Sequence, residues 1–305
     1  MDHGLAPIAL FAYKRPEHLR RTLQALAANA EAAGSRLVVF CDGARHEADR
    51  AAVEAVRGLV AGIRGFAAVR VVASPTNLGL ARSVTRGVSE LLQQYDRLVV
   101  LEDDLVVGPH FLRYMNDALR CYADDERVAS IHGYLYPVGE RLPETFFLRG
   151  ADCWGWGTWR RAWARFEPDA RKLLAELRRR GLTRAFDLDG SYPYTRMLED
   201  CIEGRNDSWA IRWHACAFLD GALTLYPGSS QVQNIGADGS GVHVGDTRTF
   251  EHAEWGREIQ VGGIAVTESA AARRCFAAYL AALRPSFAHR VLRRLRRLVP
   301  SRAAT

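Results

Sequence analysis

Three adjacent acidic residues follow a short apolar run, and they are the first candidates for chemistry in this sequence. The run Leu98–Leu101 is followed directly by Glu102, Asp103 and Asp104. Three like charges side by side repel one another, and a hard cation such as Mn²⁺ or Mg²⁺ offsets this repulsion because it prefers carboxylate and phosphate oxygens. The alternative is a solvated acidic turn before a helix. Since ligands of parallel sheets bind beyond the carboxyl ends of the strands, this position favours a site for a metal and phosphate.

Polar residues also follow two earlier apolar runs. Lys14 and Arg15 come after residues 5–13, and Asp42 closes the run at 37–41. A carboxylate in Asp42's position accepts hydrogen bonds from a base or a ribose hydroxyl, although an ordinary Asp-Gly turn explains the same residue. Together with the acids, these residues predict a ligand site along one edge of a sheet.

A possible phosphate contact lies at the start of a predicted helix near residue 80. Asn77 precedes this helix, and Arg82 falls in its first turns. The helix dipole does not favour an arginine there, which mildly supports a role in binding phosphate, while a solvated surface arginine is the alternative. No G-x-G-x-x-G fingerprint follows a strand and no G-x-x-x-x-G-K-[ST] loop is present, which argues against simple dinucleotide-binding and P-loop sites.

Further candidates for acid–base chemistry lie in the second half of the chain. Asp207 precedes Trp209 and is expected either to cap a helix or to act as a general base, with the pair Glu199-Asp200 as a competitor. The glycine-rich stretch 236–243 ends in His243, and such a loop can fold over a bound nucleotide or remain a plain turn.

The elements that must position these residues alternate between strand and helix. This alternation of short apolar strands with amphipathic helices predicts an α/β fold, Rossmann-like, with a mostly parallel sheet flanked by helices. The expected strands are 5–13, 37–41, 69–73, 98–101 and 128–132, and the expected helices run from about 16 to 26, 47 to 60, 80 to 95 and 109 to 122.

The composition changes near residue 145. Residues 1–144 are expected to form the nucleotide-binding half of one domain, 145–250 its acceptor or catalytic half, and 251–305 a helical tail. Six of the seven tryptophans lie between Trp154 and Trp213. Aromatic residues at this spacing stack on sugar rings, but more often they form a core. Basic helical segments are expected at 158–165 and 171–180, and strands at 223–226 and 231–235.

Composition and charge exclude several classes of protein. The 305 residues are 48% hydrophobic and 25% charged, as in a globular protein with a sizeable core. No apolar stretch of membrane-spanning length and no signal peptide is evident, so a cytoplasmic protein is expected. The net charge is +6, but seven arginines and no acid lie from Arg284 onward, which leaves −1 on the preceding residues and argues against nucleic acid as a partner. The six scattered cysteines include no C-x-x-C pair, so neither a zinc ribbon nor a disulfide framework is expected.

The tail contains a short basic amphipathic pattern at residues 286–299. Its apolar residues, from Phe287 to Leu298, fall on one helical face, and its arginines lie largely opposite. This pattern favours contact with an anionic membrane surface, and a helix docked on its own domain or on a partner is the alternative.

Seven motifs occur in a fixed order over residues 5–250, and this series resembles the GT-A-fold glycosyltransferases. The likeness is nearest to the N-acetylglucosaminyltransferase I family and its bacterial family-2-like relatives. The motifs are LFAYKRPEHLRRTLQAL, VVFCDGARHEAD, NLGLARS, VVLEDDLVVGPHFLRYM, CWGWGTWRRAWARFEPD, NDSWAIRW and YPGSSQVQNIGADGSGVH.

The resemblance implies roles for individual residues. Asp104 matches the metal ligand, Asp207 matches the catalytic base, and the segment Trp154–Trp159 matches one that shapes the donor and acceptor pocket. The animal family has two adjacent acids before the tryptophan, whereas Ser208 follows Asp207 here, so Asp200 remains an alternative base. The implied donor site comprises Ala12, Tyr13, Arg15, Asp42, Asn77, Arg82, Glu102, Asp103, Trp156 and His243.

The resemblance also implies a reaction. We expect an inverting, Mn²⁺- or Mg²⁺-dependent transfer of a sugar from a nucleotide-diphosphate donor, such as UDP-GlcNAc, to a hydroxyl of a glycan or lipid-linked glycan. The alternatives are a sugar nucleotidyltransferase and a non-catalytic module that binds glycans or membranes.

Overall fold

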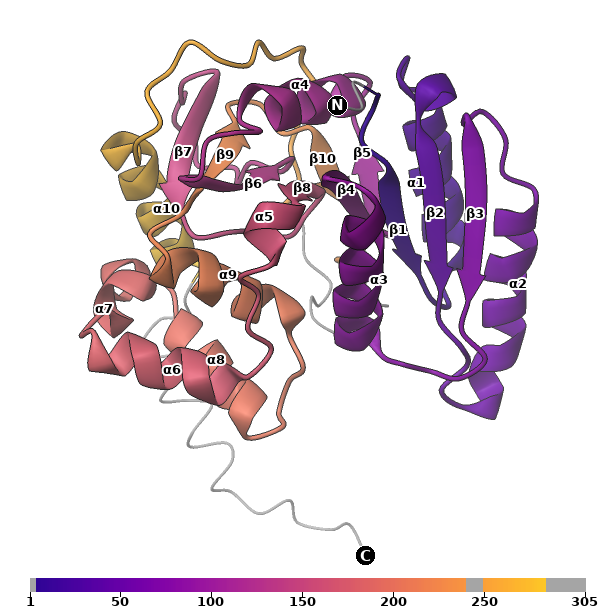
Figure 1. Ribbon diagram of the computed structural model, residues 1–305, viewed down its shortest axis with the longest axis horizontal. Coiled ribbons are helices and arrows are strands. Elements are labelled where there is room, and N and C mark those ends of the chain that lie inside the picture. Colours follow the sequence, from indigo (N-terminus) through magenta and orange to yellow (C-terminus); the bar gives the residue numbers. More distant parts are fainter. Residues whose placement is uncertain (1–3, 240–248, 284–305) are drawn as a thin grey trace, which may run out of the picture.

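The fold is built on one mixed sheet of eight strands (Figure 1). The computed structural model describes residues 4–239 and 249–283. The strands of this sheet are β1 (Ile8–Ala12), β2 (Arg36–Cys41), β3 (Ala68–Ala73), β4 (Arg97–Glu102), β6 (Val128–His132), β7 (Thr145–Arg149), β8 (Trp156–Trp159) and β9 (Leu223–Pro227). Their order across the sheet is β3-β2-β1-β4-β8-β6-β9-β7.

Most strands of this sheet point in one direction. β1 pairs in parallel with β2 and β4, β2 with β3, and β6 with β9. β8 runs antiparallel to both of its neighbours, β4 and β6, and β7 runs antiparallel to β9. The carboxyl ends of β1, β2, β4, β6 and β9 therefore meet at one edge, together with the amino end of β8.

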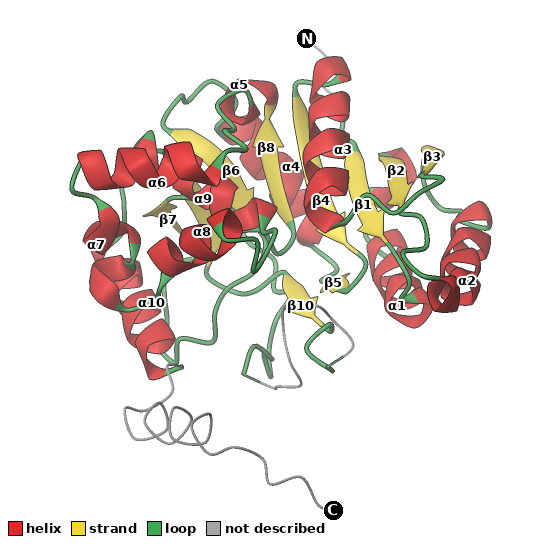
Figure 2. Cartoon of the chain, turned by 90° about the horizontal axis from the view of Figure 1, so that it is seen from below, coloured by secondary structure: helices red, strands yellow, loops and turns green. Residues whose placement is uncertain are grey.

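Helices cover both faces of the sheet, because successive residues of a strand point to opposite faces. Ile8 and Leu10 of β1 belong to one buried cluster with α1, α2 and α4, while Ala9 and Phe11 belong to another with α3, α6, α8 and α9. Figure 2 shows α1 and α2 on one side of β1–β3 and α3 on the other. The helices concerned are α1 (Pro16–Ala27), α2 (Arg50–Ala61), α3 (Leu80–Gln94), α4 (Phe111–Cys121), α6 (Ala170–Arg179), α8 (Tyr194–Ile202) and α9 (Trp209–Leu219).

A small second sheet lies at the edge where these strands end. β5 (Leu105–Val107) directly follows the three acids and pairs antiparallel with β10 (Val232–Asn234). The predicted strand at 231–235 is therefore present, but it belongs to this second sheet. The pairing turns the chain back just after the acids and brings residues 235–236 against them.

The expected α/β fold with a mostly parallel sheet is confirmed, and so are the five strands expected before residue 145. The second half departs from expectation at one point. Residues 158 and 159, expected as helix, belong to β8, and only Arg160–Trp163 forms the short helix α5. Tertiary pairing decides this difference, since β8 lies between β4 and β6 and bonds to both.

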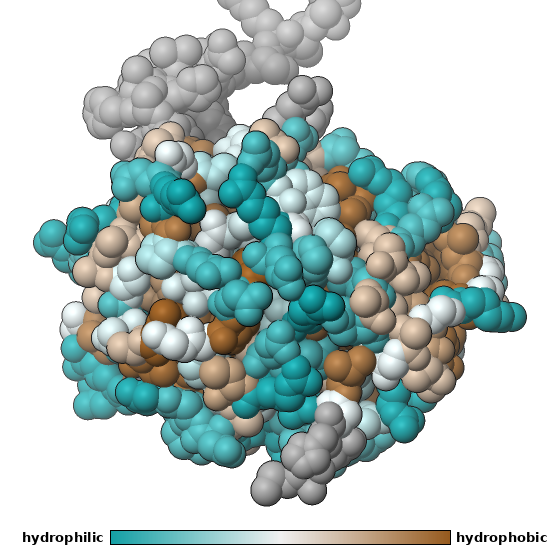
Figure 3. Space-filling model, turned by 90° about the horizontal axis from the view of Figure 1, so that it is seen from above, coloured by the Kyte–Doolittle hydropathy of each residue, from teal (hydrophilic) through white to brown (hydrophobic). Residues whose placement is uncertain are grey.

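The remaining helices complete the second half. α7 (Thr183–Phe186) connects α6 to α8, and α10 (Ala270–Ala282) packs on β7 and β9 through Phe276. On the face seen in Figure 3, hydrophobic residues are scattered among hydrophilic ones. None of the helices in the described ranges has the length and apolar character needed to cross a membrane.

Candidate active site

Arg15 and the acids after β4 form the polar centre of the sheet edge. The Arg15 Nη2 donates to Asp103 Oδ1 at 2.5 Å and to Asp104 Oδ2 at 2.9 Å. The backbone N–H of Tyr13 donates to Asp103 Oδ2 at 3.1 Å, and the Asp103 carbonyl accepts a hydrogen bond from the hydroxyl of Thr22 on α1. The two strand ends that the sequence indicated separately thus meet through an ion pair.

The electrostatics of this centre explain how three carboxyls share one edge. Burial, together with the like charges of Asp104 and Asp103, raises the pKa of Glu102 to about 8. Burial also raises the pKa of Asp103, although Arg15 opposes that shift. For Arg15, burial lowers the pKa, but the charges of Asp103 and Asp104 outweigh it and raise the pKa overall. The charge of Arg15 and the raised pKa of Glu102 both reduce the repulsion among the three carboxyls.

Asp104 is more accessible than Asp103. Its side chain is partly exposed, whereas Asp103 is buried and serves Arg15 and Tyr13. The chain returning from β10 passes so close that a Cβ on Gly236 would lie 2.1 Å from Asp104 Oδ2, so this approach requires glycine. The backbone N–H of Ile235 donates to the Asp104 carbonyl, which fixes this arrangement.

The donor set at Asp104 suits a cation that is shared with a substrate. Across the described residues, no group of three or more His, Cys, Asp and Glu side chains is arranged to hold a metal by itself. Mg²⁺ commonly binds through one or two carboxylates, with substrate phosphates and water completing the shell. Asp104 with its glycine cradle fits such an ion, and it does not fit a closed structural metal site.

Asp42 shapes the loop that follows β3. Its Oδ1 accepts the N–H groups of Gly43 and Leu78, and its Oδ2 accepts Gly79 N–H and Asn77 Nδ2, at distances of 2.8–3.1 Å. A carboxylate has about four lone-pair sites, so these four donors use its capacity. Asp42 and Asn77 thus lie in contact, and in this structure the chain itself occupies the carboxylate that was expected to contact ribose.

One buried acid at this edge was not singled out from the sequence. Asp49 accepts hydrogen bonds from the Tyr13 hydroxyl and from Lys14 Nζ, each at 2.8 Å. The Lys14 and Tyr13 hydrogen bonds lower the pKa of Asp49. No local signal marks this residue, because it lies within a predicted helix and 34 or more residues separate it from both partners. Asp49 fixes the Tyr13 ring beside Arg15, and Ala12 lies buried at the end of β1.

Two of the predicted donor residues differ in their surroundings. Arg82 is exposed in the first turn of α3, where a ligand at the sheet edge can reach it. Trp156 is fully buried, and its ring packs against those of Trp163, Trp209 and Trp213. The expectation that Trp156 contacts the donor is therefore corrected: the tryptophan cluster forms a core between β8 and α9.

Of the two candidate bases, Asp200 lies in the last turns of α8 and Asp207 lies on the segment between α8 and α9. The Asp207 side chain is 74% exposed and pairs with Arg212 Nη2 at 2.6 Å, while Asp200 pairs with both Arg196 and Arg205. The N-cap of α9 is Ser208, whose hydroxyl accepts the Ile211 N–H, so the predicted cap at Asp207 is wrong by one residue. His243 and residues 286–299 lie outside the described residues.

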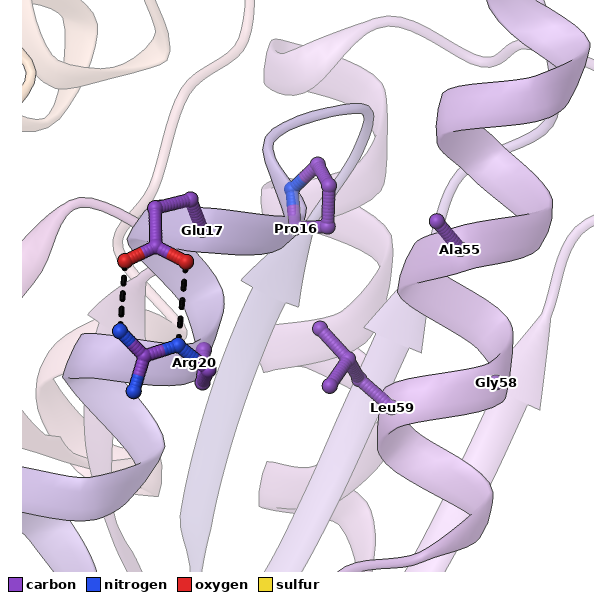
Figure 4. Close-up of a pocket in the computed structure, with 6 residues that line it drawn as sticks. All are labelled: Pro16, Glu17, Arg20, Ala55, Gly58 and Leu59. Carbon is purple, nitrogen blue, oxygen red and sulfur yellow. Dashed lines mark hydrogen bonds and ion pairs between the residues drawn. The ribbon is translucent and has the colours of Figure 1, made fainter.

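A surface groove of ≈ 450 Å³ lies between α1 and α2, and it is separate from the acids. Pro16, Glu17 and Arg20 of α1 face Ala55, Gly58 and Leu59 of α2 across it (Figure 4). Arg20 donates to Glu17 within the same helix, so the charged groups at this groove already satisfy each other.

A comparison with protein families finds a match in the first half of the chain. The model of the family described as glycosyltransferase like family 2 matches residues 7–132, about two fifths of the chain. This range runs from β1 to β6 and contains Arg15, Asp42 and the three acids. The resemblance to family-2-like glycosyltransferases is confirmed over this range, while a specific likeness to N-acetylglucosaminyltransferase I is not seen. No curated protein matches the chain.

Several solved structures are similar to this chain at a distance. A mannosyltransferase from Pyrobaculum calidifontis, solved in complex with GDP-Man and Mn²⁺, is 11% identical, with 72% of this chain and 70% of that chain covered and a TM-score of 0.39. Mannose-1-phosphate geranyltransferase from Thermus thermophilus is 16% identical over 76% of each chain, with a TM-score of 0.37. Glucosyl-3-phosphoglycerate synthase from Mycobacterium tuberculosis, solved with Mn²⁺ and UDP, is 14% identical over 58% of this chain and 67% of that one, with a TM-score of 0.33. Similarities this remote assign no role to any residue here.

Proposed function

We propose that this protein transfers a sugar, with inversion, from a nucleoside-diphosphate donor to an acceptor hydroxyl on a glycan or lipid-linked glycan. The observation that carries the proposal is the meeting of Arg15 with Asp103 and Asp104 at the carboxyl edge of the sheet, within the segment that matches the glycosyltransferase family.

The donor's diphosphate is expected beside Asp104. Asp104 would hold Mn²⁺ or Mg²⁺ through its carboxylate, and such an ion supplies charge neutralisation for the departing diphosphate. Arg15 holds the carboxyls of Asp103 and Asp104 in place, and the exposed Arg82 offers a second cation to phosphate. Asp42 and Asn77 order the loop that leads into α3 and so set where Arg82 projects.

The transfer is a single displacement. The acceptor oxygen forms a bond to the anomeric carbon while the bond from that carbon to the diphosphate oxygen breaks, and the hydroxyl proton passes to a carboxylate base. We propose Asp207 for this base, since its one ion pair leaves it more exposed than Asp200, which two arginines engage.

Donor binding tests the proposal first. A panel of nucleotide sugars is added to the protein with and without Mn²⁺, and the thermal midpoint is measured. We expect a Mn²⁺-dependent rise with one donor, and we expect Asp104→Asn to remove it. Asp117→Asn is the matched control, because that exposed carboxylate on α4 only pairs with Arg120.

Product analysis then identifies the reaction. Release of a nucleoside diphosphate with an inverted anomeric linkage supports the proposal, whereas release of pyrophosphate identifies a nucleotidyltransferase. Asp207→Asn is expected to abolish transfer while donor binding is retained. Full transfer by Asp207→Asn would remove this residue as the base.

A further inference from the structure

Asp152 lies on the same sheet edge as the three acids, although the sequence gives no sign of this. Trp156, the first residue of β8, lies opposite Val100 of β4 and His132 of β6. Because β8 is antiparallel to both neighbours, the residues just before Trp156 run past the carboxyl ends of β4 and β6. Figure 2 shows β8 between these strands. This places Asp152 on the side of the acids that faces away from β1.

The contacts of Asp152 leave its carboxylate only partly satisfied. The Tyr136 hydroxyl donates to Oδ2 at 3.1 Å, and the Cys153 N–H donates to Oδ1 at 2.8 Å. The Nε2 of His132 lies 3.7 Å from Oδ2, beyond hydrogen-bond distance. The Asp152 side chain is 19% exposed, so a ligand can still reach it.

His132 is an unpartnered polar group beside this carboxylate. Its side chain is fully buried, and among the described residues neither of its ring nitrogens has a hydrogen-bond partner. An unsatisfied buried polar group costs free energy, and a bound hydroxyl or water would remove that cost. The carboxylate and the imidazole together therefore indicate a place for a hydrogen-bonding ligand.

The backbone that carries Asp152 is held firmly. The neighbouring Ala151 N–H donates to His214 Nδ1 at 3.1 Å. Gly150 has φ +96°, and a Cβ there would lie 2.4 Å from the His214 ring. This segment is consequently fixed against α9, as a preformed binding site requires.

Several aromatic side chains lie near this carboxylate. Tyr134 contacts Trp154 and Tyr136 with ring centroids 4.7 and 5.3 Å apart, and the His132 ring lies 5.0 Å from that of Tyr226. Burial, reinforced by the charge of Asp152, raises the pKa values of Tyr136 and Tyr226. The charge of Asp152 acts on Tyr134, Tyr136, Tyr192, Tyr194 and Tyr226, of which Tyr134 and Tyr226 are buried.

Electrostatic interactions connect Asp152 to the acids on the donor side. Burial raises the pKa of the Cys153 thiol, and the charges of Asp152, Glu102 and Asp104 all add to that shift. The Cys153 side chain is therefore near carboxylates of both groups.

We propose that Asp152 and the partly exposed side chains of Tyr136, Tyr192 and Tyr194 near it form the acceptor subsite, in which Asp152 accepts a hydrogen bond from a hydroxyl of a neutral sugar ring. This inference rests on the proposed function and names the class of acceptor. Aromatic faces take the apolar face of a sugar ring, while the carboxylate and the tyrosine hydroxyls take its polar edge.

The charge of the subsite selects against anionic acceptors. Burial lowers the pKa values of His132 and His214, so both are neutral near pH 7. Among the described residues, no lysine or arginine forms an ion pair with Asp152, whose contacts are Tyr136, Cys153 and His132. A phosphate or carboxylate on the acceptor ring would meet repulsion there.

Matched neutral and anionic acceptors test the proposal on the full chain. Methyl glycosides of neutral hexoses and the corresponding methyl uronides are compared as acceptors, with the donor found by thermal shift. Their binding without donor is followed by tryptophan fluorescence. We expect binding and transfer with a neutral glycoside, and at least about tenfold lower kcat/KM with its uronide.

Variants separate this inference from the proposed function. Asp152→Asn is expected to raise KM for the neutral glycoside about tenfold or more, as expected when a hydrogen bond to a charged group is lost. The variant should also have a smaller ratio of kcat/KM for the neutral glycoside to kcat/KM for the uronide. Its rate of donor hydrolysis by water and its thermal midpoint should stay close to those of the wild type. Asp117→Asn should change none of these values.

Several outcomes would overturn the inference. They are a wild-type preference for the uronide, an unchanged KM in Asp152→Asn, or an unchanged neutral-to-uronide ratio in that variant. If the protein neither binds nor hydrolyses any nucleotide sugar, the proposed function fails instead. In that case fluorescence binding of the neutral glycoside, and its loss in Asp152→Asn, still decides whether Asp152 forms a sugar site.

Discussion

Replacing Asp42 with asparagine should destabilise the protein although it changes only one atom. The carboxylate accepts two donors on each oxygen: Gly43 and Leu78 N–H on Oδ1, and Gly79 N–H and Asn77 Nδ2 on Oδ2. In Asp42→Asn, an NH₂ group replaces one oxygen and faces two donors that it cannot satisfy, whichever way the amide is turned.

The magnitude follows from those two lost bonds. A hydrogen bond to a charged group contributes roughly 1.5–3 kcal/mol net. Because the loop is partly exposed, water replaces part of the lost hydrogen bonding. We therefore expect the free energy of unfolding to fall by about 3 kcal/mol, the lower limit for two such hydrogen bonds. At roughly 2 °C per kcal/mol for a protein of this size, the thermal midpoint should fall by about 6 °C.

The assay is thermal and urea unfolding of Asp42→Asn beside Asp117→Asn. The control removes an exposed surface ion pair, and its free energy of unfolding should fall by about 0.5 kcal/mol or less. A midpoint for Asp42→Asn within about 1 °C of wild type, a shift well below the estimate, would refute the reasoning. It would mean that the four short contacts do not hold the loop.

Other predictions concern the acceptor side. Gly150→Ala should cost about 2–4 kcal/mol, because it combines an unfavourable positive φ with a Cβ only 2.4 Å from the His214 ring. Gly221→Ala, at φ +66° with nothing within 4 Å of the added Cβ, should cost only about 1 kcal/mol; equal losses in the two variants, measured by urea unfolding, would contradict this. The free energy of unfolding should also fall below pH 6.5, because burial lowers the pKa of His132 in the folded state, so the unfolded chain binds the extra proton. His132→Leu should therefore lose less stability than wild type between pH 7 and pH 5 in thermal melts, and parallel curves would show that His132 does not contribute.

The first half of the fold could be predicted because its signals are local. Apolar runs such as residues 37–41 and 128–132 are short and bounded, and each forms a strand near its predicted limits. The helix predicted from about residue 16 is present as α1, which begins at Pro16, and proline suits the first turn of a helix. The three acids were evident for the same reason, because they are adjacent in sequence.

The second half was less predictable, because strand pairing decides it. Residues 158 and 159 have no strand pattern of their own, yet β8 forms where β4 and β6 both offer hydrogen bonds. Trp156 looked like a ligand contact among several tryptophans, and only packing shows that its ring is enclosed by three others.

The sequence by itself determined the α/β architecture, the acidic strand end and the distribution of charge, because each depends on residue type and short-range spacing. Tertiary structure decided which side chains share a site. It joined Asp49 to Tyr13, filled the lone pairs of Asp42, and brought Asp152 to the edge that carries Asp104. The residues brought together in this way are about 35 to 50 positions apart in the sequence. No local pattern predicts that they meet, and they come together only when the strands pair.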